Sequence, residues 1–129
     1  MQRPIFHLSF PVRDLAAAKA FYRDFLGASI GRDNDQWADV LLFGHQLTLH
    51  QRPGEVLSPE LRGVRHFGAV LPWDDWEALG TKLLQKGIVF VRAPAISDAG
   101  TMEEHGKMLL SDPQRQPYRD QGVQESRVL

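Results

Sequence analysis

The sequence predicts an α+β fold built from two similar halves. A strand, a helix and further strands follow one another twice, and the two starts lie about 60 residues apart. Both predicted helices carry an apolar stripe and end at a glycine, Gly27 in the first half and Gly87 in the second. Each half would therefore pack one helix on a curled sheet, and halves this small are expected to share a buried surface.

The first half has a clear signal for each element. Residues 5–10 alternate between two faces and predict a strand. Asp14 is a good N-cap for a helix over residues 15–26, whose apolar residues recur every three or four positions. Gly27 suits the left-handed position that follows a helix. Three short strands are predicted next, over residues 29–32, 37–43 and 46–51.

The second half repeats this order after a linker rich in proline and glycine. We divide the chain into a first module at residues 1–52, a linker at 53–63 and a second module at 64–129. The second module should begin with a strand over residues 64–71. Asp74 or Asp75 should then cap a helix that runs to about Lys86. Further strands are predicted over residues 88–92 and 107–110, with a long loop over 93–106 between them.

Composition excludes several classes of partner. Fifteen basic and sixteen acidic residues give a net charge of −1, which provides no field to attract nucleic acid or an anionic membrane. No apolar run is long enough to cross a bilayer, and the first residues lack the pattern of a signal peptide. With no cysteine in the chain, we expect a cytoplasmic protein whose metal ligands, if any, are nitrogen or oxygen atoms.

Two stretches of the first half form a fairly specific signature. Residues 6–15 read Phe-His-Leu-Ser-Phe-Pro-Val-Arg-Asp-Leu, and residues 20–27 read Ala-Phe-Tyr-Arg-Asp-Phe-Leu-Gly. Together they resemble the N-terminal signature of the vicinal-oxygen-chelate superfamily, which includes glyoxalases, bleomycin-resistance proteins and extradiol dioxygenases. Residues 65–70 resemble the first strand of that superfamily's second module, and residues 109–113 resemble the approach to its last strand.

The resemblance implies paired βαβββ modules whose mixed sheets curl around a metal-binding cavity. Ligands in this superfamily come from the first and last strands of each module, which assigns His7, His66 and His50 here. Such a set would suit a divalent ion of iron, zinc, nickel or manganese. We expect Trp37 and Phe43 to line the cavity, together with Thr48, which shares a strand face with His50.

The final strand of the second module is missing from the expected place. The resemblance implies a glutamate ligand there, but residues 114–129 show no apolar alternation and Arg119 occupies its position. A guanidinium cannot lose its charge, so it would repel a cation where a carboxylate would bind one. We therefore interpret the tail from residue 114 as non-native.

A shift of reading frame explains this tail. When residues 114–126 are back-translated with suitable permitted codons and read one base later, the product contains Ser-Gly-Asn and Ile-Glu-Ile, as the superfamily's last strand does. We infer a one-nucleotide insertion near the Pro113 codon. The nucleotide sequence tests this inference, because a gene that cannot be read this way around Pro113 would exclude it.

Three functions remain open from the sequence. The first is a metal-dependent enzyme acting on a small substrate with vicinal oxygens, either a glyoxalase-type lyase or isomerase or an extradiol-type dioxygenase. The second is a metal-free protein that sequesters a small molecule or antibiotic, as bleomycin-resistance members do. The third is an inactive product of the damaged reading frame. In the first two cases the resemblance implies a homodimer.

Overall fold

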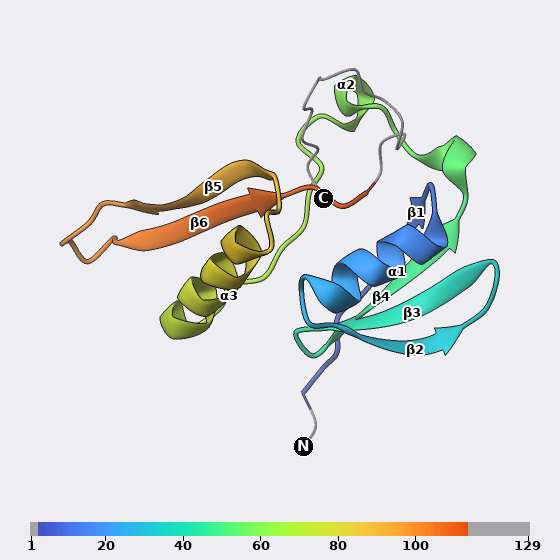
Figure 1. Ribbon diagram of the computed structural model, residues 1–129, viewed down its shortest axis with the longest axis horizontal. Coiled ribbons are helices and arrows are strands. Elements are labelled where there is room, and N and C mark those ends of the chain that lie inside the picture. Colours follow the sequence, from blue (N-terminus) through green and yellow to red (C-terminus); the bar gives the residue numbers. More distant parts are fainter. Residues whose placement is uncertain (1–2, 114–129) are drawn as a thin grey trace.

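The computed structural model describes residues 3–113, and it has a complete first half and a smaller second half (Figure 1). The first half contains β1 (His7–Val12), α1 (Leu15–Asp24), β2 (Ser29–Asp33), β3 (Trp37–Leu42) and β4 (His45–Gln51). A short 3₁₀ helix, η1 (Pro53–Glu55), and α2 (Pro59–Arg62) lie in the connection. The second half contains α3 (Trp73–Gln85), β5 (Phe90–Ser97) and β6 (His105–Leu110). The α+β class predicted from the sequence is confirmed.

The first half forms a four-stranded mixed sheet in the order β1-β4-β3-β2. β1 runs parallel to β4, with His7 opposite Gln46 and Val12 opposite Gln51. The other pairs are antiparallel, and β3 and β4 are joined by a tight turn at Phe43 and Gly44, both of which have positive φ. α1 is the crossover between the first two strands of the chain, and it covers one face of the sheet (Figure 1).

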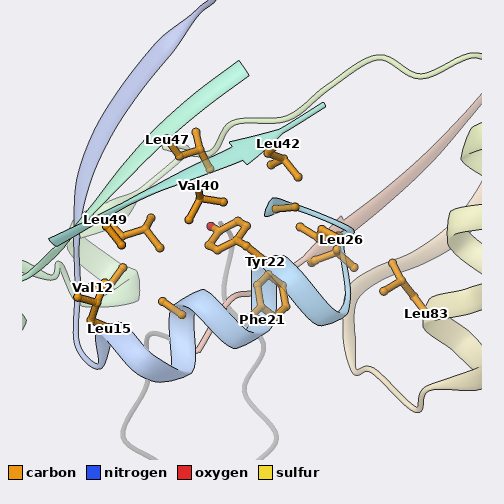
Figure 2. Close-up of a cluster of buried hydrophobic side chains, with 14 residues drawn as sticks. Val12, Leu15, Phe21, Tyr22, Leu26, Val40, Leu42, Leu47, Leu49 and Leu83 are labelled. Carbon is orange, nitrogen blue, oxygen red and sulfur yellow. The ribbon is translucent and has the colours of Figure 1, made fainter. Parts of the chain in front are cut away.

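The main core lies between α1 and this sheet. Tyr22 on α1 is fully buried against Val40 and Leu49 of the strands, as Figure 2 shows. Leu83 of α3 and Leu110 of β6 belong to the same buried cluster, so the second half packs against the end of this core. The other buried members of the cluster all lie in the first half: Val12, Leu15, Ala18, Phe21, Leu26, Ala28, Ala38, Leu42 and Leu47.

One buried hydrogen bond links the two halves directly. The Tyr22 hydroxyl on α1 donates to Oδ2 of Asp112, just after β6, at 3.0 Å. Burial and the adjacent Asp112 carboxylate raise the pKa of the Tyr22 hydroxyl well above its ordinary value. The hydroxyl therefore stays protonated and remains a donor across the physiological range.

The residues that begin and end the helices agree only in part with those predicted from the sequence. Asp14 caps α1 as predicted, because its side chain accepts a hydrogen bond from the Ala17 amide at 3.1 Å. The prediction that Asp74 or Asp75 caps α3 is wrong. Pro72 holds the cap position, and both aspartates lie in the first helical turn, where their charge favours the helix dipole. Gly27 and Gly87 follow their helices with positive φ, as predicted.

The predicted strand over residues 64–71 does not form. Within the described part of the chain this segment makes no strand hydrogen bonds, and Val64 and Val70 are exposed. The reason lies in strand order: among the described strands, the first strand of the first half pairs with the fourth, β4, and with no other. Among residues 3–113 the second half has only the pair β5–β6, so residues 64–71 have no such partner. The inferred tail from residue 114, including Arg119, lies outside the described residues.

The remaining differences are shifts of boundary. β1 begins at His7 rather than at Ile5, and residues 93–97, predicted as loop, extend β5. The predicted linker contains two short helical segments, η1 and α2. No helix among residues 3–113 is both long and apolar enough to cross a membrane.

Candidate functional site

The face of the first sheet that α1 does not cover carries a group of polar side chains, which we call the open face. Because side chains alternate along a strand, the apolar partners of α1 and the open-face residues occupy alternate positions. The registers align three rows across β1, β4 and β3. These rows are His7, Gln46 and Leu41; Ser9, Thr48 and Asp39; and Pro11, His50 and Trp37.

Asp39 lies at the centre of the open face and is only 3% exposed. Its Oδ1 accepts a hydrogen bond from the Thr48 hydroxyl at 2.7 Å, directly across from β4. Its Oδ2 accepts one from Nε of Arg32 at 2.6 Å, from β2. A buried carboxylate is costly unless it is paired and hydrogen-bonded, and here both oxygens have a donor. Asp39 therefore orders three neighbouring strands on this face.

The charge of Asp39 is maintained by these neighbours. Burial by itself would raise the pKa of the Asp39 carboxyl. The hydrogen bonds from Arg32 and Thr48, with the charges of Arg32 and His7, outweigh burial and lower that pKa below its ordinary value. Asp39 is therefore a carboxylate at neutral pH.

Two histidines of the open face are oriented by hydrogen bonds. Nδ1 of His7 donates to the side-chain oxygen of Gln46 at 2.8 Å, which leaves Nε2 of a neutral ring as an acceptor. Nε2 of His50 lies 2.8 Å from the Ser9 hydroxyl. His7 pairs with Gln46, four residues before His50 on β4, so the two histidines are separated by roughly 13 Å along the strands. The structure therefore does not bring His7 and His50 to one ion.

His66 lies in the segment that does not form a strand. It is exposed, and its Nδ1 donates to the Val64 carbonyl at 2.7 Å, which again leaves Nε2 free to accept. Within residues 3–113, no three side chains of histidine, cysteine, aspartate or glutamate lie close enough together to hold a metal ion. The donor set in this part of the chain therefore does not fit a metal centre, and the ligand roles of His7, His50 and His66 stay predictions.

The three residues that were predicted to line the cavity do not all lie on the same face of the sheet. Trp37 and Thr48 both lie on the open face, and Thr48 is 8% exposed. Phe43 lies in the β3–β4 turn with φ of 51° and is exposed. The open face thus contains two of the three.

Sequence reasoning missed the residues at the centre of the face, Asp39 and Arg32. Asp39 has a signal that was available: it is an acidic residue in the middle of the otherwise apolar segment over residues 37–43. Arg32 has no such signal, because simple alternation places it on the same side as Ile30, which packs against the core. A shift of register between Ile30 and Asp33 brings Arg32 to Asp39 instead.

The hydrogen bonds of Asp39 predict a specific pH dependence of the free energy of unfolding. Because its folded-state pKa is lowered, Asp39 contributes stability above its unfolded-state pKa of about 3.9, and this contribution is lost as the pH falls through the folded-state value. Unfolding by urea from pH 7 to pH 2 should show the wild type losing stability more steeply than Asp39→Asn below about pH 4. Asp35→Asn, an exposed acid in the β2–β3 turn, is the matched control and should follow the wild type. Parallel curves for wild type and Asp39→Asn would contradict the proposed pairing.

Comparison with known proteins relates the whole fold to one superfamily. The sequence model of the Glyoxalase/Bleomycin resistance protein/Dioxygenase superfamily matches residues 5–116. A search of curated proteins finds no match. A crystal structure of a glyoxalase/bleomycin resistance protein/dioxygenase from Alicyclobacillus acidocaldarius is 31% identical, with a TM-score of 0.71, and the match covers 86% of this chain and 84% of that one.

Two more distant structures share the fold. A genomically encoded fosfomycin resistance protein from Listeria monocytogenes is 14% identical, with a TM-score of 0.68 and 88% of each chain covered. A lactoylglutathione lyase from Agrobacterium tumefaciens is 18% identical, with a TM-score of 0.59 and 88% of each chain covered. From the family match over most of its length, this chain belongs to the Glyoxalase/Bleomycin resistance protein/Dioxygenase superfamily.

Proposed function

We propose that this chain binds a small molecule against the open face of its first sheet, without a metal ion. The observation that carries the proposal is the ordered polar surface around Asp39. Thr48, Arg32 and Ser9 are fixed by hydrogen bonds across the strands of one sheet. Rigid strands that present convergent polar groups beside apolar side chains such as Trp37 are typical of small-molecule sites.

The metal-free form of the proposal follows from the donor geometry. In residues 3–113, His7, His50 and His66 come from separate places and no third donor joins any two of them. The bleomycin-resistance type of member, which sequesters a molecule without turning it over, is therefore the nearest functional class. Because the net charge is only −1, the chain as a whole does not select ligands of one charge, and the side chains of the open face determine which ligand binds.

A second candidate is a metal-dependent lyase, isomerase or dioxygenase. One specific observation favours it: His7 and His66 both donate through Nδ1 to a carbonyl oxygen, which leaves Nε2 unprotonated in the neutral ring. This is the arrangement by which metal-ligating histidines are usually oriented. Such an enzyme would need a further donor from outside the described residues or from a second copy of the chain.

The proposal extends to the oligomeric state of the chain and to its place in the cell. We propose a homodimer, supported by exposed apolar residues just before β1 and in residues 64–71, namely Ile5, Phe6, Val64 and Val70. The absence of cysteine supports a cytoplasmic location.

One screen separates the two functional candidates. Full-length protein labelled with ¹⁵N and freed of metal is titrated with a library of small polar and aromatic molecules, and amide shifts are mapped by NMR. We expect hits to shift β1, β3 and β4 signals of the open face, including Ser9 and Thr48, and to do so equally well in the presence of a chelator. Hits that cluster elsewhere on the chain would contradict the proposal.

Zinc, manganese, nickel and ferrous ions are titrated in the same experiment. Stoichiometric metal binding that is lost in His7→Ala and in His66→Ala would favour the enzyme. His105→Ala is the matched control, because the His105 Nδ1 also donates to a nearby backbone carbonyl, that of Glu103, at 2.7 Å.

A further inference from the structure

Arg32 is positioned on the open face by an irregularity in β2. Ile30 pairs with Val40 and Asp33 pairs with Ala38, so β2 uses one more residue than β3 over this interval. Such a bulge redirects a side chain that regular alternation would place on the other face. Gly31 helps this approach, because a Cβ at that position would lie 3.3 Å from the Asp39 Cβ. The result is a cation beside the most buried polar group of the face.

The guanidinium of Arg32 is fixed from two sides. Its Nε donates to Asp39, and its central carbon lies 5.1 Å from the centre of the Trp37 ring. Its side chain is nevertheless 73% exposed. Across the part of the chain that the structure describes, its two terminal nitrogens have no hydrogen-bond partner. Arg32 therefore presents unused donors in a fixed orientation.

We propose that Arg32 is the group that recognises an oxyanion, a carboxylate or a phosphonate, on the small molecule bound at the open face. This inference rests on the proposed function and adds the chemical class of the ligand. A guanidinium matches two oxygens of such a group with parallel hydrogen bonds, and a guanidinium that is already held loses less freedom when the ligand binds. Trp37 and the exposed Leu41 offer apolar surface nearby for the rest of the ligand.

A purely structural role for Arg32, as the counter-ion of Asp39, predicts something different. In that case a lysine at position 32 would serve the same purpose and no ligand would sense the change. Other arginines show what such pairing looks like. Arg23 on α1 donates through Nε to Asp24 at 2.8 Å and also through a terminal nitrogen at 3.2 Å, so both donors serve its aspartate.

The test uses three probes of similar shape: benzoate, phenylphosphonate and neutral benzamide. Binding to the full-length chain is followed by the NMR shift of the Trp37 indole N–H and of the open-face amides. In the wild type we expect at least one anion to bind about tenfold or more tightly than benzamide. Arg32→Gln should remove that preference. Arg32→Lys, which keeps the charge beside Asp39 and thus the fold, should weaken anion binding severalfold because the planar fork is lost.

Arg23→Gln is the matched control, since it removes one exposed, aspartate-paired arginine from α1, and it should bind all three probes as the wild type does. The two anions distinguish a carboxylate ligand from a phosphonate ligand. Equal binding of anions and benzamide, or anion binding that is unchanged in Arg32→Gln, overturns the role of Arg32 and leaves the proposed function intact. If none of the three probes shifts any open-face signal, this inference fails, and the library titration decides the proposed function separately.

Discussion

The parallel pairing of β1 with β4 is the interaction on which the rest of the structure depends. A strand that leaves its backbone donors and acceptors unpaired gains little from being extended, and within residues 3–113 the strand partner of β1 is β4. Once this pair forms, the alternation of side chains divides the sheet into two faces. One face packs on α1 around Tyr22, and the other presents the polar groups around Asp39. The candidate site is therefore a direct product of strand pairing in the first half.

The same requirement explains why the second half looks different. β5 and β6 pair with each other and are supported by α3, where Trp76 lies so close to Gly106 that any side chain at that position would clash with it. A two-stranded ribbon is marginal alone, so its contacts with the first half matter. Leu83, Leu110 and the bond from Tyr22 to Asp112 supply them. Residues 64–71 have the pattern of a strand, but among the described residues they have no partner corresponding to β4.

Much of the fold could be predicted from local signals, and the two largest failures concern features that local signals do not determine. The α1 cap at Asp14 and the glycine stops depend on near neighbours, and they are found. The predicted strands of the first half are found as well, because each of them has a partner within that half. The strand at residues 64–71 depends on a partner distant in sequence, which local alternation does not report. Local alternation places Thr48 and His50 on one strand face in advance, whereas the turning of Arg32 toward Asp39 depends on a bulge in β2. Side chains whose orientation relies on irregular backbone are the hardest to place from sequence.

Hydrogen–deuterium exchange of the full-length chain, resolved by residue, tests this account most directly. It predicts slow exchange for the bonded amides of β1 and β4, whose pairing holds the open face in place. It also predicts fast exchange for the amides of residues 66–71, which make no strand hydrogen bonds among the described residues. Strong protection of residues 66–71, comparable with that of β1, would contradict the account, because it would require a strand partner for the second half.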